Sequence, residues 1–123
     1  MAYLSDSVFD NGLSYITNNT ENLYLLSADP ELIWSNITTY AIGSKATPSI
    51  SSPSDRTGGG REVIISAVTD GNGTSTGSAT HFALTDDSNT EIIASNSLAI
   101  PISVTSGGSF ETESFTVGIP DPA

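Results

Sequence analysis

Cysteine is absent from this chain of 123 residues, and only three lysine and arginine residues stand against fourteen acidic ones. Without cysteine, neither a disulfide framework nor a thiolate metal site nor a cysteine nucleophile can form. The formal net charge of −11 repels the phosphates of DNA and RNA, and it opposes attraction to an anionic membrane surface. We therefore expect neither direct nucleic-acid binding nor membrane binding.

Long apolar runs are missing as well. No stretch approaches the ~18 apolar residues that a helix needs to cross a bilayer. Met1–Asp6 lacks the basic start and apolar centre of a secretory signal. We expect the protein to remain in the cytosol of its host cell unless it leaves as part of something larger.

The chain does contain short runs of β-branched and aromatic residues that end in Gly, Asn or Asp. Arg61–Val68, Ser78–Thr85 and Thr90–Ser95 are such runs, and Asp70–Gly73 and Asp86–Asn89 separate them. The separating residues tolerate the positive φ angles that tight hairpin turns require. The pattern predicts strands that fold back on one another.

Near the start, apolar residues recur with helical spacing. They are Leu4, Val8, Phe9, Gly12, Leu13 and Ile16. The spacing predicts a helix over residues 5–18, with Ser5 or Asp6 as N-cap and Asn18–Asn19 as a left-handed stop. Such a helix either covers its own domain or docks on a neighbouring subunit.

The next segment predicts a strand at Asn22–Ser27 that is buried on nearly both faces. Asp29 followed by proline favours a new turn of helix, which would carry Leu32–Trp34. The single tryptophan beside Leu and Ile is typical of a core residue. Ile37–Ile42 and Thr47–Ile50 are predicted to be two further strands.

Residues 51–60 contain Ser, Pro, Asp and three consecutive glycines without a large apolar side chain other than the stem of Arg56. This composition predicts a surface loop, or an arm that orders against a partner. A phosphate-binding loop is disfavoured, because no Gly-Lys-Ser/Thr follows and the next element is a strand.

In the last third, Leu98–Val104 alternates as a strand does, and Pro101 places it at an edge or at a bulge. Phe110 and Phe115 have opposite parity, so a bulge near Thr112–Ser114 is needed to bury both. Together, about eight short strands predict one all-β domain over residues 1–123. The predicted fold class is an antiparallel two-sheet sandwich, jelly-roll-like, with one N-terminal helix and a tail over residues 118–123.

Few residues suggest chemistry. His81 lies mid-strand without a Gly-x-Ser-x-Gly turn nearby, and Glu111 and Glu113 lack the aromatic residues of a sugar cleft. Asp70–Thr74 resembles the opening of a calcium loop, but the distal Glu is missing and turn chemistry explains the same residues. We expect a protein that is not an enzyme, with no catalytic, cofactor or metal site.

Three segments resemble a known family: Tyr3–Leu13, the centre from Gly60–Val63 through Thr80–Asp86, and Phe115–Pro120. They look like small structural proteins of tailed bacteriophages. Among these are cement, or decoration, proteins on the outer face of the icosahedral head. The resemblance spans most of the chain.

The resemblance implies a viral structural protein that binds the head and stabilises contacts between major capsid subunits. Its partners would be the major capsid protein and its own copies, as a dimer or trimer, and it would reside in the virion after assembly in the host cytoplasm. The alternative is a tail, baseplate or fibre-associated β module that recognises the host surface. The expected contacts lie in residues 1–4 with the helix, the 51–61 loop and the 118–123 tail. The contact residues are Tyr3, Leu4, Arg56, Arg61, Ile119 and Pro120.

Overall fold

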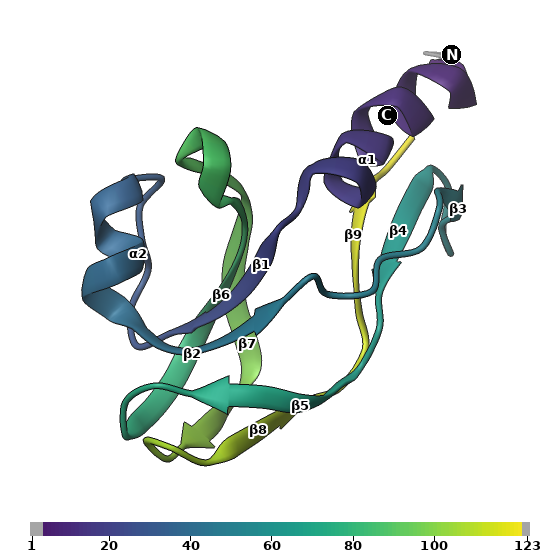
Figure 1. Cartoon of the computed structure of the whole chain (residues 1–123). Coiled ribbons are helices and arrows are strands. Elements are labelled where there is room, and N and C mark those ends of the chain that lie inside the picture. Colours follow the sequence, from purple (N-terminus) through teal and green to yellow (C-terminus); the bar gives the residue numbers. More distant parts are fainter. Residues whose placement is uncertain (1–3, 122–123) are drawn as a thin grey trace.

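The computed structural model describes residues 4–121, which form two antiparallel sheets and two α-helices (Figure 1). In chain order the elements are α1 (Asp6–Asn19), β1 (Asn22–Leu26), α2 (Trp34–Tyr40), β2 (Ala41–Ala46), β3 (Ser54–Asp55), β4 (Arg61–Ile65), β5 (Val68–Gly73), β6 (Gly77–Asp86), a 3-10 turn (Asp87–Asn89), β7 (Glu91–Val104), β8 (Ser109–Thr112) and β9 (Phe115–Ile119). Neither α-helix in this range has the length and apolarity to span a bilayer.

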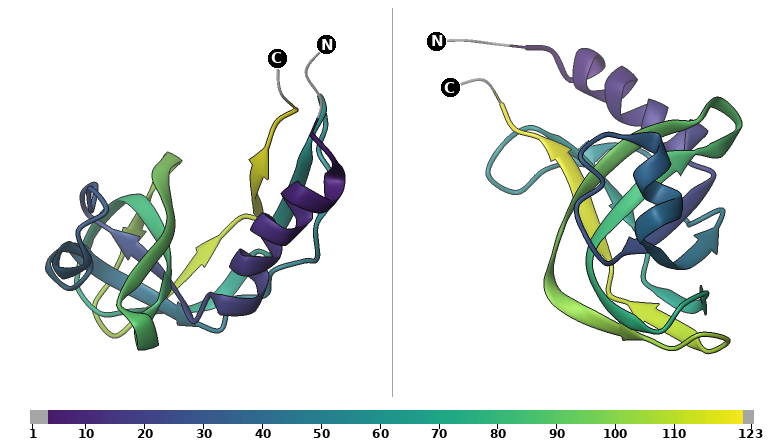
Figure 2. Two further views of the ribbon diagram at one scale, coloured as in Figure 1. Left: turned by 90° about the horizontal axis from the view of Figure 1, so that it is seen from above. Right: turned by 90° about the vertical axis from the view of Figure 1, so that its left-hand side faces the viewer.

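One sheet has six strands in the order β7-β6-β1-β2-β5-β8, and the other has three in the order β3-β4-β9. The larger sheet curls, and the smaller one stands against it with α1 alongside β4 (Figure 2). The predicted fold class, an antiparallel two-sheet sandwich with an N-terminal helix, is confirmed. The helix α2 was predicted only in part. The sequence predicts a turn of helix that carries Leu32–Trp34, whereas α2 runs from Trp34 to Tyr40.

The core lies between the sheets and beneath α1. Phe9, Leu13 and Ile16 of α1 are buried, whereas Leu4 is 39% exposed and Val8 is 54% exposed. The predicted apolar stripe of the helix is therefore divided, with its C-terminal two turns on the core and its start facing solvent. This division leaves apolar side chains exposed where the helix begins.

Strand β1 is buried on both faces, as its sequence predicts. Leu23 and Leu25 belong to the main core, and Leu26 packs in a second cluster with Ile37 of α2. The reason is its position between β2 and β6, with core on one face and α2 on the other.

The helix α1 begins after Ser5, one of its two predicted N-caps, and ends at Asn19. The predicted left-handed asparagine stop is wrong. Thr20 instead has an extended backbone with φ −72°, and both its N–H and its hydroxyl donate to the carbonyl of Ile16. A side-chain bond thus ends the helix without a positive φ.

Residues 29–50 differ most from the prediction. Glu31 and Leu32 have left-handed φ angles of 55° and 58°, so the helix expected from Pro30 begins only at Trp34. Ile37 was expected in a strand but lies in α2, because burial against Leu26 outweighs its strand propensity. The strand predicted at 47–50 is reduced to one isolated bridge between Ile50 and Ile65.

Asp70–Gly73 was predicted to be a turn, yet it runs through β5. The glycines are needed for space. A Cβ at Gly71 would lie 2.3 Å from the Phe110 ring, and one at Gly43 would lie 2.9 Å from it. Phe110 therefore packs directly on the backbone of two neighbouring strands, and the turn moves to residues 74–76.

Of two predictions about the last third, the edge strand with a bulge at Pro101 is confirmed, whereas the bulge expected near Thr112–Ser114 is instead a break between two strands. β7 is an edge strand, and its pairing with β6 is interrupted between Ser97 and Ile102, which brackets Pro101. The opposite parity of Phe110 and Phe115 causes no conflict, because the strand breaks at residues 113–114 and the two rings lie in different sheets. The two strands predicted at 90–95 and 98–104 merge into β7.

We predict that Gly71→Ala destabilises the fold by about 1–3 kcal/mol, because the added methyl group overpacks the Phe110 ring. Gly77→Ala is the matched control, since its methyl group would meet only Ile42 Cδ1 at an ordinary 3.7 Å. Urea unfolding of both variants measures the difference. Equal midpoints would show that Phe110 moves aside freely.

Candidate interaction surface

The described parts of the three segments predicted to contact a partner, which exclude residues 1–3 and 122–123, meet at one end of the molecule. In Figure 1 the start of α1, the β3–β4 hairpin and the end of β9 lie together, far from α2. We call this end the terminal surface and define it as residues 4–10, 56–61 and 118–121. It joins parts of the chain that are more than a hundred residues apart in the sequence.

The glycine run brings the hairpin against the tail. Gly58, Gly59 and Gly60 have φ angles of 91°, 104° and 95°. A Cβ at Gly60 would lie 2.0 Å from the carbonyl oxygen of Ile119, and one at Gly59 would lie 2.9 Å from Asp121 Oδ2. The glycines thus serve close backbone approach, and the predicted loop over 51–60 also contains the short strand β3.

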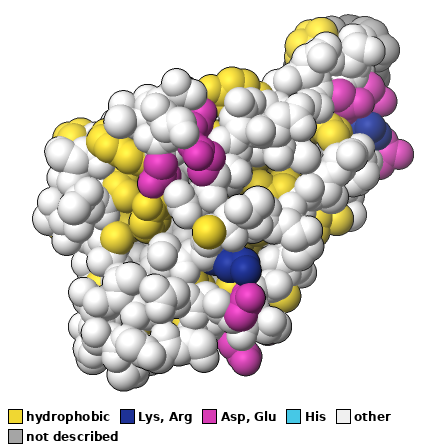
Figure 3. Space-filling view, in the orientation of Figure 1, with side chains coloured by type: hydrophobic (Ala, Val, Ile, Leu, Met, Phe, Trp, Pro, Cys, Tyr) yellow, Lys and Arg dark blue, Asp and Glu magenta, His cyan; other side chains and the backbone are white. Residues whose placement is uncertain are grey.

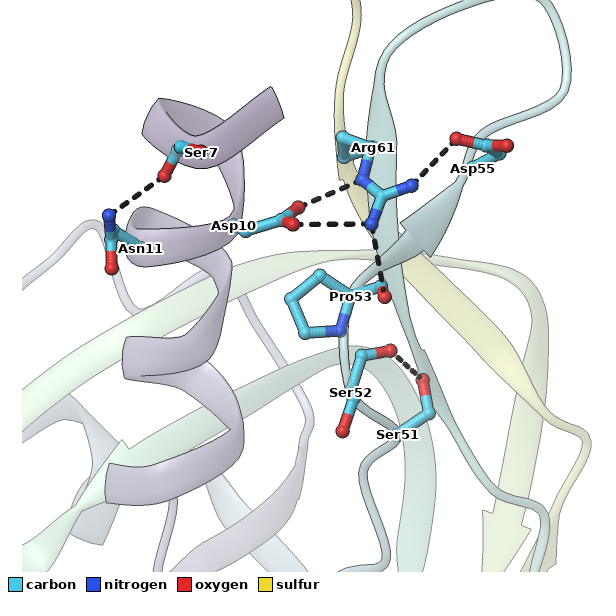
Figure 4. Close-up of polar contacts among 8 residues, drawn as sticks. All are labelled: Ser7, Asp10, Asn11, Ser51, Ser52, Pro53, Asp55 and Arg61. Carbon is cyan, nitrogen blue, oxygen red and sulfur yellow. Dashed lines mark hydrogen bonds and ion pairs between the residues drawn. The ribbon is translucent and has the colours of Figure 1, made fainter. Parts of the chain in front are cut away.

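Arg61 fastens this end together (Figure 4). Its Nε donates to Asp10 Oδ1 at 2.8 Å, and its Nη1 donates to Asp55 Oδ1 at 2.6 Å. Nη2 reaches Asp10 Oδ2 at 3.2 Å and the carbonyl of Pro53 at 3.4 Å. The hydrogen bonds to Asp10 and Asp55 raise the pKa of Arg61 further above its usual value. Arg61 therefore holds α1 to the β3–β4 hairpin, and its contact with a partner stays a prediction.

Arg56 is placed differently. Its guanidinium donates to the carbonyl of Gly59 at 3.0 Å, and its stem crosses Gly118, where a Cβ would lie 3.0 Å from Arg56 Cδ. Lys45 pairs with Asp70, and Arg61 pairs with two aspartates. Within residues 4–121, Arg56 is the basic residue without an ion pair, so its charge is available to an outside carboxylate.

The terminal surface also exposes apolar groups. Leu4, Val8 and Ile119 each expose more than a third of their surface, and Pro120 is exposed beside them. Figure 3 shows hydrophobic side chains at the end where α1 begins. Tyr3, the remaining predicted contact, lies outside the described residues.

The chemical candidates are dispersed. His81 lies on β6, and its Nδ1 is 2.9 Å from the Thr80 hydroxyl. Glu111 is exposed on β8, whereas Glu113 follows the end of that strand. No group of three histidine or acidic residues within residues 4–121 could hold a metal ion.

The acidic pair at the β6–β7 turn is held by hydrogen bonds. Asp87 accepts from Tyr24 at 2.7 Å and from Thr85 at 2.6 Å, and Asp86 accepts from Asn89 at 2.8 Å. Burial raises the pKa of Asp87, but the bonds from Thr85 and Tyr24 outweigh it, so this pKa lies below its usual value. The bond from Asn89 likewise lowers the pKa of Asp86. Both carboxylates are thus ionised turn acceptors at neutral pH.

Sequence reasoning missed one feature, an apolar groove between β7 and the β8–β9 segment. Its volume is about 680 Å³, and its floor is Leu23, Leu25 and Phe82. The signals available in the sequence were the edge proline of β7 and the parity change between Phe110 and Phe115. Neither signal says which strands face each other across the molecule.

Comparison with protein-family models, curated proteins and solved structures found no match to this chain. The terminal surface and the groove are therefore defined by geometry, burial and charge alone. The resemblance to phage structural proteins stays a prediction.

We predict that Arg61→Met lowers the unfolding midpoint more than Lys45→Met does. Arg61 is 18% exposed and joins β4 to both α1 and β3 through two aspartates, whereas Lys45 is 29% exposed and has a single partner, Asp70, whose side chain is 71% exposed. Solvent-exposed pairs contribute little. Thermal unfolding gives the midpoints, and hydrogen exchange should show faster opening of α1 only in Arg61→Met. An equal effect of both variants would contradict the fastening role.

A second prediction concerns Tyr24, whose pKa is raised to about 12 by burial and by its bond to Asp87. An unfolded tyrosine titrates near pH 10. The neutral ring therefore contributes stability that is present below pH 10 and is lost as the pH rises toward 12. Tyr24→Phe should cost about 1 kcal/mol at pH 7 through the lost hydrogen bond and should flatten this alkaline loss.

Urea unfolding between pH 7 and pH 12 measures the effect. Tyr15→Phe is the control, because the hydroxyl of Tyr15 also donates to a carboxylate, that of Glu91, but at an exposed site. It should change the alkaline slope less than Tyr24→Phe does. If the free energy of unfolding of Tyr24→Phe falls with pH as steeply as that of the unmodified chain, the Tyr24–Asp87 bond does not cause the alkaline loss of stability.

Proposed function

We propose that this chain is a viral structural protein, a capsid cement or decoration protein. It binds the outside of a tailed-phage head and stabilises contacts between major capsid subunits. The observation that supports the proposal most is the terminal surface. The three segments that the resemblance implies as contacts lie apart in the sequence, yet they meet at one end of the fold.

The terminal surface has the make-up of a docking site. It carries exposed apolar groups at Leu4, Val8 and Ile119, and it carries the guanidinium of Arg56. Arg61 and the glycine run make it rigid, which reduces the entropy lost on binding. The net charge of −11 favours a partner surface that offers basic groups.

The mechanism is additive burial. A standard interface buries roughly 1,600 Å². Repeated over a closed shell, and strengthened where copies associate as dimers or trimers, such contacts resist outward pressure through avidity. No catalytic step is required of the protein, which acts by contact in the virion.

The test uses purified particles of the phage that encodes this chain. A decoration protein is present in many copies on the head, so gold-labelled antibody against the chain should mark heads, and the protein should be a major band of the particle. Label confined to the tail or its fibres would overturn the proposal in favour of the tail-associated alternative.

A pair of variants tests the surface itself. Val8→Glu, on the terminal surface, should lower binding to heads stripped of the protein at least tenfold, because a charge replaces an apolar contact. Leu32→Glu is the matched control, since Leu32 is 76% exposed near α2 at the other end of the molecule. Co-sedimentation with stripped heads measures both. An equal loss of binding in both variants would mean that the added negative charge alone weakens binding, and the terminal surface would then be removed from the proposal.

A further inference from the structure

The apolar groove lies between two strands whose facing edges have no partner. β7 is the last strand of the six-stranded sheet, and β9 is the last strand of the three-stranded sheet. The groove is lined by residues 94–102 on one side and residues 111–118 on the other. In Figure 2 these two strands stand on opposite arms of the molecule. Each edge presents backbone N–H and C=O groups toward the opening.

The core is incomplete on this side. Leu98, Ile102, Phe115 and Val117 pack against the buried core but remain partly exposed, and all four line the groove. Phe115 packs on Phe82 at the floor, with ring centroids 4.5 Å apart and ring planes tilted by 51°. An apolar occupant would cover these side chains and complete the core.

The two edges differ in how well they are protected. β7 carries Pro101 and a bulge between Ser97 and Ile102, which are common devices against strand addition. β9 reads Phe-Thr-Val-Gly-Ile, without proline, charge or bulge, and it pairs in regular register with β4 at all five positions. The free edge of β9 is therefore the one that can accept another strand.

Charge indicates the kind of occupant. Glu111 and Glu113 lie on the groove wall just before β9, and no lysine, arginine or histidine within residues 4–121 lines the groove. A second copy of this chain would offer the groove few basic groups, because it has only three lysine and arginine residues and Lys45 and Arg61 are already in ion pairs. A segment with basic residues would be attracted.

We propose that the groove binds an extended, basic segment of a different protein, which adds as a strand to the free edge of β9. Its alternate apolar side chains enter the groove along β9, and the lysine or arginine residues that extend past the start of β9 lie near Glu111 and Glu113. Backbone hydrogen bonds supply affinity, and the alternating side chains supply specificity. That the donor is a capsid subunit rests on the proposed function, whereas the groove and its ligand chemistry do not.

The test uses the full chain, labelled with ¹⁵N, and synthetic nine-residue peptides. Each peptide has valine at alternate positions and lysine, serine or glutamate at the others, and the set covers both strand directions and all registers. The lysine peptides should bind at least tenfold tighter than the glutamate peptides, and added salt should reduce the difference. Amides of residues 115–119 should gain protection from hydrogen exchange. Peptides N-methylated along one edge should lose binding.

Variants locate the site. Glu111→Gln combined with Glu113→Gln should remove most of the preference for lysine peptides. Asp29→Asn combined with Glu31→Gln removes the same charge at exposed positions outside both the groove lining and the terminal surface, and should change little. Ala94→Trp should block the groove, and Ala67→Trp, at an exposed position outside the lining, is its control.

Three results would overturn the inference: no peptide protects β9, lysine and glutamate peptides bind equally, or β9 becomes protected by rising protein concentration alone. Dodecanoate that fills the groove without protecting β9 would show a small-molecule pocket and would also overturn it. Peptide binding together with tail-only labelling would leave the groove standing while the capsid proposal fails. Head labelling without peptide binding would support the capsid proposal and would overturn the inference about the groove.

Discussion

One bend in a pair of antiparallel strands determines the rest of this structure. β4 continues into β5 and β8 continues into β9, while β5 pairs with β8 and β4 pairs with β9. The ladder stops at the pair Val68–Thr112 and resumes at the pair Ile65–Phe115, so that each strand skips two residues. A single two-stranded ribbon therefore supplies the edge of one sheet and most of the other. Because the skip is equal on both strands, the register continues correctly across the bend.

Both candidate surfaces result from this bend. Turning the ribbon carries β9 away from β7, which keeps the large sheet from closing and leaves the groove between two free edges. The same turn carries the far ends of β4 and β9 toward α1, where Arg61 at the start of β4 can reach Asp10. A closed barrel would bury the apolar lining and remove the free edge. The open form leaves the groove exposed at the expense of core burial.

Local patterns in the sequence predicted the local features well. Helical spacing located α1, strand patterns located β1 and β6, and Pro101 located an edge with a bulge. The misses have a common cause in tertiary packing. Asp70–Gly73 has turn composition but lies in a strand because Phe110 needs glycine beneath its ring, and Ile37 has strand propensity but lies in a helix that covers Leu26. The groove could not be predicted, since it depends on which edges remain unpaired in two sheets whose strands extend from residue 22 to residue 119.

β9 connects the two surfaces physically. Its edge faces the groove, its outer face at Gly118 supports the stem of Arg56, and its end at Ile119 lies against Gly60. Gly60 lies so close to β9 that an added Cβ would come within 2.0 Å of the Ile119 carbonyl, so the backbones of the hairpin and of β9 pack directly on each other. A strand that pairs with β9 would hold this backbone in place, and the hairpin, Arg61 and α1 would be held with it. If the groove binds a strand, we therefore expect the terminal surface to become less mobile as well.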